Sequence, residues 1–277
     1  FFPSLIPRFN LRINYRNHRK IVVIDGEIGY IGGFNIGDEY LGKNKYFGYW
    51  RDAHLRIRGS AVYDLEERFL LDYGYASKDS YDLKEEYFPQ SLTTCGSPIQ
   101  IVSDGPDTEE QYIKSGFLKM ISVAKKSIYI ETPYFIPDES MMDALKMAAN
   151  SGLDVRIIIP NKPDHPFVYW ASYSYIGELL PCGVKVYTYE KGFIHSKIIL
   201  VDGEIASIGT TNMDIRSFKL NFEINAFLYG RRNCYRFTEM IEHDIERSKE
   251  ITVETYKNRP LKIKLQEAVS RLFSPLL

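Results

Sequence analysis

A histidine, a lysine and an aspartate occur twice in this chain with the same spacing, H-x-K-x4-D-G. The two copies begin 177 positions apart, and 10 of the 18 positions from His18 to Asn35 are identical in the second copy. A His, a Lys, an Asp and an Asn in one fixed frame are unlike a chance recurrence of aliphatic residues. The repeat predicts one active site built from two similar halves. Its candidate catalytic residues are His18, Lys20, Asp25, His195, Lys197 and Asp202.

These residue types suit chemistry at a phosphate. Two ammonium groups bind a phosphate and stabilise the charge that builds on its oxygens during reaction. One neutral imidazole can attack phosphorus and form a phosphohistidine. The other, when protonated, can donate a proton to the leaving oxygen and then accept one from the incoming alcohol. Such a site requires no metal ion and no cofactor.

Other polar residues are candidates for binding the phosphate or orienting the imidazoles. Asn35 and Asn212 follow the two motifs at equal distance and can hydrogen-bond a phosphate oxygen, although a turn or cap role fits them equally well. Each histidine also needs an orienting carboxylate. The candidates are Glu223, 28 residues after His195, and Asp52, 34 residues after His18. The alternative for both is a salt-bridged or solvent-facing strand residue.

The two motif aspartates have a second interpretation. Asp25-Gly26 and Asp202-Gly203 are typical of tight hairpin turns between aliphatic runs. We expect hairpins from 21–24 to 28–31 and from 197–201 to 205–208. Because alternate strand residues share a face, the His and Lys of each copy should project together. A turn role for the two aspartates is at least as well supported as a chemical one.

The second copy is preceded by alternating strand and helix patterns. Strands are predicted at 99–102, 127–131, 155–159 and 184–189. Helices are predicted at 108–125, with Thr108 and Gln111 as a capping box, and at 138–150, 168–180, 233–248 and 261–273. This alternation predicts an α/β layer fold with mixed sheets flanked by helices.

The two copies differ in what comes before them. About 96 residues of α/β pattern precede His195, from Ile99 to Ile194, whereas 17 residues precede His18. We therefore expect residues 1–74 to be the C-terminal part of a first half whose opening elements are missing. Residues 75–96 are the expected linker, and residues 97–277 the second half with C-terminal helices.

Composition narrows the class of protein. The hydrophobic content of 44% is enough for a folded core, and the net charge of −1 argues against a general nucleic-acid binder. Residues 1–24 nevertheless hold five basic residues and no acidic one. This local charge suits a small or membrane-borne anion. No stretch approaches the 18 or so apolar residues that cross a bilayer.

The doubled motif resembles the signature of the phospholipase D superfamily, and the flanking phrases resemble the bacterial cardiolipin synthases within it. These phrases include Gly32-Gly33-Phe34-Asn35, Trp50-Arg51-Asp52, Thr132-Pro133-Tyr134-Phe135 and Ser217 to Glu223. The resemblance implies two phospholipase D-like halves with the active site at their interface. It also implies transfer of a phosphatidyl group between two phosphatidylglycerol molecules, with release of glycerol, at the bacterial cell membrane. N-terminal membrane segments, absent from this chain, would anchor the enzyme there.

Two alternatives remain open from the sequence. A phosphodiesterase that uses water needs the same catalytic residues, so the motif does not exclude a phospholipase or a nuclease. The near-neutral charge argues against the nuclease, and the synthase-like phrases argue against simple hydrolysis. A non-catalytic lipid-binding piece is the third possibility for this chain, although both motifs are intact.

Overall fold

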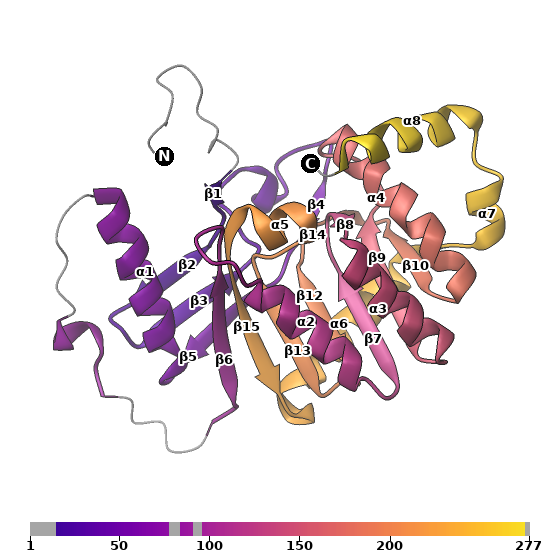
Figure 1. Cartoon of the computed structure of the whole chain (residues 1–277). Helices are drawn as coiled ribbons and strands as arrows, with labels where there is room; N and C mark the ends of the chain where they lie inside the picture. The colour runs from indigo at the N-terminus through magenta and orange to yellow at the C-terminus, as the bar shows by residue number, and fades with distance from the viewer. Residues whose placement is uncertain (1–14, 78–83, 91–95, 275–277) are drawn as a thin grey trace.

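A large mixed sheet forms the centre of the protein, whose computed structural model describes residues 15–77, 84–90 and 96–274 (Figure 1). Within these residues the strand order is β1-β15-β13-β12-β7-β9-β10-β16. Strand β6 also pairs with β15, along the residues that follow those paired with β1. The strands are β1 (Arg16–Asn17), β6 (Ile99–Asp104), β7 (Ser127–Glu131), β9 (Asp154–Pro160), β10 (Lys185–Tyr189), β12 (Ile198–Val201), β13 (Ile205–Gly209), β15 (Asn221–Tyr229) and β16 (Ser248–Ile251).

A second, smaller sheet contains the hairpin that follows His18 and Lys20 of the first copy. It has the order β2-β3-β5, with β2 (Ile21–Ile24), β3 (Ile28–Gly32) and β5 (His54–Arg58), and is followed by helix α1 (Ala61–Ser77). One hydrophobic cluster joins Ile31 and Leu65 of this half to Ile208 and Ile224 of the large sheet. The two halves therefore share a core, which fixes the position of one motif relative to the other.

The helices cover both faces of the large sheet. Helices α2 (Tyr112–Val123), α3 (Glu139–Asn150) and α4 (Pro166–Leu179) bury Phe117, Met141 and Ile176 in one cluster. Helix α6 (Arg231–Glu246) packs Phe237 and Ile241 into the cluster shared by the two halves. The short elements are η1 (Glu39–Leu41), β4 (Tyr49–Arg51), η2 (Glu85–Tyr87), β8 (Phe135–Ile136), η3 (Leu180–Cys182), β11 (Gly192–Ile194), β14 (Met213–Asp214), α5 (Ile215–Lys219), α7 (Val253–Lys257) and α8 (Leu261–Leu272).

The α/β fold with mixed sheets and flanking helices is confirmed. The predicted strands and helices of the second half are present within a few residues of their expected bounds, and Asp138 caps α3 by accepting a hydrogen bond from the Met141 amide. The predicted start of the helix at Thr108 is wrong. Helix α2 begins at Tyr112, because Asp104 accepts the Ile113 amide and residues 105–110 form a turn.

The expected linker is only partly visible. Helix α1 extends to Ser77, and η2 lies within the 75–96 segment. Residues 78–83 and 91–95 are outside the described residues. The division into 1–74, 75–96 and 97–277 stays a prediction.

Candidate active site

Each H-x-K motif lies between two strands rather than on one. His18 and Lys20 lie between β1 and β2, and His195 and Lys197 lie between β11 and β12. The expectation that a strand carries the motif itself is therefore wrong. Each lysine is instead held next to its histidine by a hydrogen bond to the histidine backbone. The Lys20 ammonium donates to the His18 carbonyl at 2.7 Å, and the Lys197 ammonium donates to the His195 carbonyl at 2.6 Å. Both ammonium groups are thereby held at the backbone of their own histidine, and Lys197 also lies beside its imidazole.

Two parallel strand pairs tie the halves together at the motifs. Strand β1 pairs with the start of β15, and the His18 amide donates to the Phe222 carbonyl at 2.9 Å. Strand β11 pairs with β4, and the His195 amide donates to the Arg51 carbonyl at 2.7 Å. The two arrangements are equivalent. In each, a motif histidine lies beside the residue that precedes a carboxylate from the other half.

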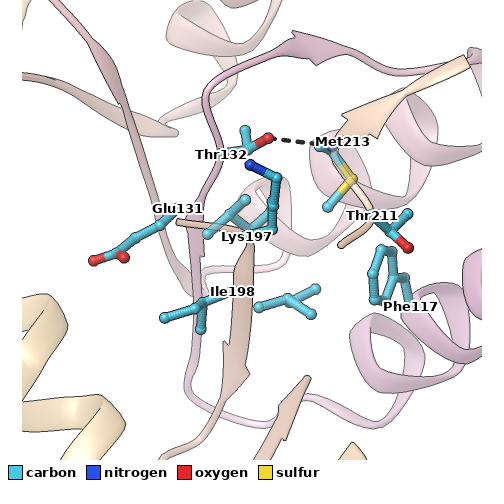
Figure 2. Close-up of a pocket in the computed structure, with 9 residues that line it drawn as sticks. Phe117, Glu131, Thr132, Lys197, Ile198, Thr211 and Met213 are labelled. Carbon is cyan, nitrogen blue, oxygen red and sulfur yellow. Dashed lines mark hydrogen bonds between the residues drawn. The ribbon is translucent and has the colours of Figure 1, made fainter. Parts of the chain in front are cut away.

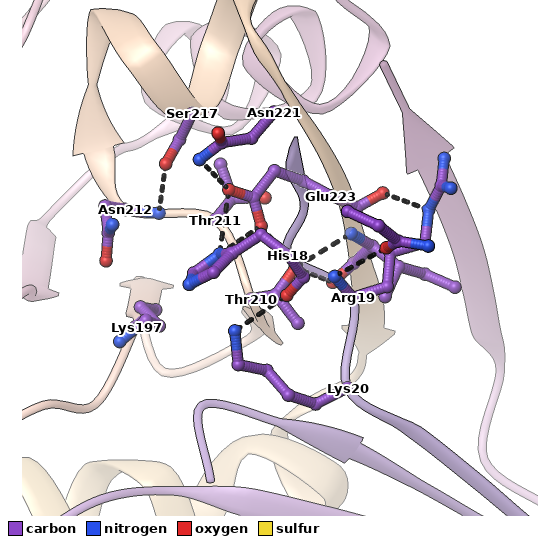
Figure 3. Close-up of polar contacts among 12 residues, drawn as sticks. His18, Arg19, Lys20, Lys197, Thr210, Thr211, Asn212, Ser217, Asn221 and Glu223 are labelled. Atoms are coloured by element: carbon purple, nitrogen blue, oxygen red, sulfur yellow. Dashed lines mark hydrogen bonds and ion pairs between the residues drawn. The ribbon is translucent and has the colours of Figure 1, made fainter. Parts of the chain in front are cut away.

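The orienting carboxylates are exchanged between the halves. The His18 Nδ1 atom lies 2.9 and 3.0 Å from the two Glu223 oxygens, and the His195 Nδ1 atom lies 2.7 Å from Asp52 Oδ2. The sequence spacing assigned each carboxylate to the histidine of its own half, and that assignment is wrong. Each half orients the histidine of the other, so both are needed for a complete site; Figure 3 shows the pair of His18 and Glu223.

Both carboxylates are held in their ionised form. Burial raises the pKa of Glu223, but the charge and hydrogen bond of His18 and the hydroxyl of Thr210 outweigh it, so the pKa lies below its ordinary value. Burial likewise opposes ionisation of Asp52, but His195 and Lys197 hold its pKa below the ordinary value. An ionised carboxylate at Nδ1 fixes the ring and leaves Nε2 to face the site.

The residue that follows Gly32 in the first half differs from the one that follows Gly209 in the second, because the two carboxylates differ in length. Thr210 donates its hydroxyl to Glu223 at 2.5 Å. Gly33 holds the equivalent position in the first half, where an added Cβ would come 2.3 Å from Asp52 Oδ1. The shorter aspartate lies nearer the backbone and occupies the space that a side chain at position 33 would need. Glycine there follows from the geometry of Asp52.

The lysines and His195 lie in a buried, electropositive environment. Burial and the Lys197 charge lower the pKa of Lys20 to about 7, although the negative charges of Glu223 and Asp52 act to raise it. Burial lowers the pKa of Lys197 to about 8. Burial and Lys197 also lower the pKa of His195 to about 4, so at neutral pH its ring is an uncharged base. A phosphodiester anion between these groups would favour the charged form of each lysine.

The Lys197 side chain contacts the His195 imidazole and also lines a small cavity. Its Nζ atom lies 3.1 Å from His195 Nε2. The cavity is lined by Lys197, Thr132 and Met213, among others, and Thr132 Oγ1 accepts a hydrogen bond from the Met213 amide at 3.2 Å (Figure 2). This bond joins the β7–β8 loop to the segment that carries Asn212.

The two asparagines are placed differently. Asn212 is buried, and among the described residues its Oδ1 atom has no hydrogen-bond partner. Its backbone amide is fixed by the Ser217 hydroxyl at 3.2 Å, and the side chain lies beside Lys197 (Figure 3). Asn35 instead donates to the hydroxyl of Tyr40. The geometry favours Asn212 as a phosphate ligand and gives Asn35 a role in holding Tyr40.

Sequence reasoning missed several residues around the histidines. Asn221 donates to Glu223 Oε1 at 3.1 Å. Its position two residues earlier on the same strand face was an available signal. The rings of Tyr40 and Trp50 pack on His195 with centroids 5.9 and 5.2 Å away. Trp50 adjoins a predicted site residue, but nothing in the spacing places Tyr40 here.

The motif aspartates Asp25 and Asp202 occupy the two hairpin turns, and this geometry favours the turn role over a direct catalytic one. Both have a φ of +55° and are followed by a glycine with a φ of +65°, as in a type I′ hairpin turn. Each follows a four-residue strand that begins just after the motif lysine, a separation of about 13 Å. Asp202 accepts hydrogen bonds from the amides of Lys125, Lys126 and Ser127 at 2.8, 2.8 and 2.9 Å.

Asp202→Ala should therefore destabilise the fold and leave the chemistry intact. It removes three hydrogen bonds to a charged acceptor and puts a Cβ-bearing residue without local hydrogen bonding at positive φ, for a loss of about 2–4 kcal/mol. Asp202→Asn tolerates that φ and should cost less. Thermal unfolding and turnover measured well below the unfolding temperature test this. An unchanged unfolding temperature with lost turnover would restore the catalytic interpretation.

Within residues 15–77, 84–90 and 96–274, no group of three or more His, Cys, Asp or Glu side chains converges in the manner of metal ligands. No helix in the same ranges has both the length and the apolar content that a bilayer crossing requires.

Comparison with known proteins agrees with this geometry. Residues 117–245 match the family described as cardiolipin synthase, PLD-like domain. Over its whole length the chain is 56% identical to the cardiolipin synthase of Listeria innocua and 55% identical to the major cardiolipin synthase ClsA of Bacillus subtilis. The chain belongs to the phospholipase D superfamily. It spans 58% of the length of each of these two relatives.

A solved structure supports the superfamily assignment at the level of fold. The phosphatidylserine synthase of Haemophilus influenzae superposes with a TM-score of 0.72 at 15% identity, over 95% of this chain and 71% of that one. At this identity the likeness shows the fold alone. The mixed α/β fold is therefore found in a protein whose sequence differs at most positions from this one.

Proposed function

We propose that the intact protein is a cardiolipin synthase, which transfers a phosphatidyl group from one phosphatidylglycerol to another and releases glycerol. The observation that carries this proposal is the pair of histidines, each with its own lysine and with a carboxylate from the opposite half. The identity of 56% over the whole chain to a cardiolipin synthase selects the reaction among those such a site can perform.

The geometry suits a two-step transfer. In the first step one imidazole Nε2 attacks phosphorus, the bond from phosphorus to the glycerol oxygen breaks, and the other imidazolium gives that oxygen its proton. In the second step the now neutral imidazole takes the proton from a hydroxyl of the second phosphatidylglycerol, whose oxygen attacks phosphorus as the phosphorus–nitrogen bond breaks. Lys20, Lys197 and Asn212 bind the phosphate oxygens in both steps.

Hydrolysis is the competing outcome at the same site. Water in place of the second lipid would yield phosphatidic acid. The described residues around His195 include the rings of Tyr40, Trp50 and Phe193 within 6.4 Å of the imidazole. An apolar wall of this kind limits water near the phosphorus–nitrogen bond, which favours the lipid alcohol as acceptor.

The substrate implies a membrane setting. We propose that the protein works at the bacterial cell membrane on phosphatidylglycerol and other anionic phospholipids, as the family resemblance implies. The buried lysines at the site bind a single phosphate group, and the net charge of −1 does not suit a long polyanion.

The intact protein incubated with labelled phosphatidylglycerol in vesicles containing EDTA should form cardiolipin and free glycerol in equal amounts. The site residues supply the nucleophile, the acid and the cations, so chelation should not reduce the rate. Thin-layer separation of the lipids and an enzymatic glycerol assay measure both products. Phosphatidic acid as the sole labelled product would show a hydrolase instead.

A further inference from the structure

A cluster of three buried charged side chains lies behind His195. Arg51 is 9% exposed, and Glu131 and Asp244 are each 1% exposed. The Arg51 guanidinium donates from Nε and lies within 2.6 Å of Asp244 Oδ2, whereas its distance to Glu131 is 3.9 Å. One guanidinium thus faces two carboxyl groups. If both carboxyl groups were ionised, a negative charge would be left without a counter-ion in the core, which is costly.

Glu131 has one oxygen with a clear partner and one without. Its Oε2 accepts the hydroxyl proton of Ser196 at 2.5 Å. Its Oε1 is buried and, among the described residues, accepts no hydrogen bond. A proton on Oε1 would let Glu131 donate to Asp244, which satisfies that atom and makes the cluster neutral. Burial first, and the Asp244 charge as well, raise the pKa of Glu131 to about 7, which agrees with a protonated side chain.

The cluster is joined to the active site by short bonds. The Arg51 Nη1 atom donates to the Asp52 carbonyl at 2.6 Å, and the Arg51 carbonyl accepts the His195 amide at 2.7 Å. Ser196, which Glu131 holds, lies between His195 and Lys197 in the chain. Glu131 is among the residues that line the small cavity beside Lys197, but its carboxylate is directed away from the other lining side chains (Figure 2). Glu131 therefore reaches the reacting groups only through other residues.

We propose that Glu131, in its protonated form, is a positioning residue that holds Ser196 on one side and the Arg51–Asp244 pair on the other. The hydrogen bond to Ser196 fixes the segment from His195 to Lys197, and the one to Asp244 steadies Arg51, which ends β4 and precedes Asp52. The proposal rests on the proposed function only for its kinetic readout, because the bonds themselves are a property of this chain. Glu131 does not touch substrate.

Substitutions at position 131 separate hydrogen bonding from charge. Glu131→Gln keeps an acceptor for Ser196 and a donor for Asp244, so kcat should stay within about 3-fold of the wild type. Glu131→Ala removes both and should lower kcat by about 10- to 100-fold with KM for phosphatidylglycerol unchanged, the size expected when catalytic groups are displaced by about 1 Å. Ser196→Ala should show a smaller loss of the same kind.

Glu267→Ala is the matched control. Glu267 is 2% exposed and is held by Arg259 at 2.6 Å, in the α7–α8 region at the end of the chain. Its loss should lower the unfolding temperature as Glu131→Ala does and leave kcat unchanged. Equal kinetic losses in both alanine variants would reduce the role of Glu131 to general stability and overturn the proposal.

Two measurements report on Glu131 without any enzyme assay. The ring nitrogen NMR signals of His195 should shift in Glu131→Ala and stay in place in Glu131→Gln and Glu267→Ala. The unfolding temperature of the wild type should fall relative to Glu131→Gln as the pH rises from about 4.5 through about 7. A carboxyl group with a raised folded pKa loses its contribution over that range, and glutamine has none to lose. The charged groups that face Glu131 are Arg51 and Asp244, and Tyr189 lies beside this pair with Arg247 next to it.

These measurements decide the proposal even if the protein makes no cardiolipin. An unmoved His195 signal in Glu131→Ala would overturn it. So would a Glu131→Gln variant that loses as much activity as Glu131→Ala, or one whose stability follows pH in parallel with the wild type. Failure of the lipid assay in the wild type, with the His195 shift present, would instead count against the proposed reaction.

Discussion

His18→Ala and His195→Ala will each reduce phosphatidyl transfer by at least about 10³-fold, and the double variant will be no worse than the more damaged single one. Nucleophilic attack and proton donation belong to one reaction, so removing either residue stops it and the losses do not add. Initial rates of cardiolipin formation, measured for each purified intact variant in the same vesicles, test this expectation.

His243→Ala provides the control for these variants. His243 is exposed on α6, contacts Glu246 at 3.4 Å and belongs to neither motif, so its loss should leave the rate unchanged. Full activity in either motif variant would remove the shared site. Strictly additive losses would indicate two independent sites rather than one built from two halves.

Asp52→Asn will disturb His195, and Glu223→Gln will disturb His18, although each pair is far apart in the sequence. An amide at Nδ1 supports the wrong tautomer and cannot stabilise an imidazolium, so transfer should fall by about 10²- to 10⁴-fold in each variant. The contacts at 2.7 Å and 2.9 Å define which histidine responds. Ring nitrogen NMR signals assigned to the two histidines measure the response directly.

The exchanged pairing makes this prediction specific. Asp52→Asn should shift the Nδ1 signal of His195 and leave that of His18 close to its wild-type position, with the reverse for Glu223→Gln. Asp154→Asn is a suitable control, since Asp154 at the start of β9 pairs with Lys185 at 3.0 Å and contacts neither histidine. A shift in the histidine of the same half would show that the carboxylates are not exchanged.

Much of the fold could be predicted because its signals are local. The hairpins at Asp25-Gly26 and Asp202-Gly203 follow from a turn type that needs positive φ at both positions, and both are present. The buried strand β9 follows from a β-branched run, and the N-terminus of α3 from the side chain of Asp138. The start of α2 could not be predicted in this way, because Asp104 lies nine residues before the amide that it accepts.

The exchange of carboxylates was not accessible from spacing. It depends on two short parallel pairs, β1 with β15 and β11 with β4, that join segments more than 140 residues apart. Such pairs are two or three residues long and leave no periodic pattern. Counting from each motif correctly selected Glu223 and Asp52 as residues beside the imidazoles. The same counting assigned each carboxylate to the wrong histidine, because the repeat carries information about each half and none about how the two halves pack.

The buried cluster behind His195 shows a further limit of sequence reasoning. Arg51, Glu131 and Asp244 come from β4, β7 and α6, and none has a spacing that relates it to the others. The motif position between His and Lys is also used differently in each copy. Arg19 donates to the Glu223 and Asp104 carbonyls, whereas Ser196 donates to Glu131. A sequence repeat predicts equivalent roles only for identical residues, and Arg19 and Ser196 differ.

A burst titration tests most directly whether one site is built from both halves. The intact protein would be mixed with a phosphatidyl ester of p-nitrophenol, whose leaving group needs little help from an acid. We expect one equivalent of p-nitrophenolate per chain in the burst, with the lipid phosphate recovered on a single motif histidine. The burst should be lost when that histidine is replaced and retained when the other is replaced. Two equivalents per chain, or a full burst in both His18→Ala and His195→Ala, would contradict the account.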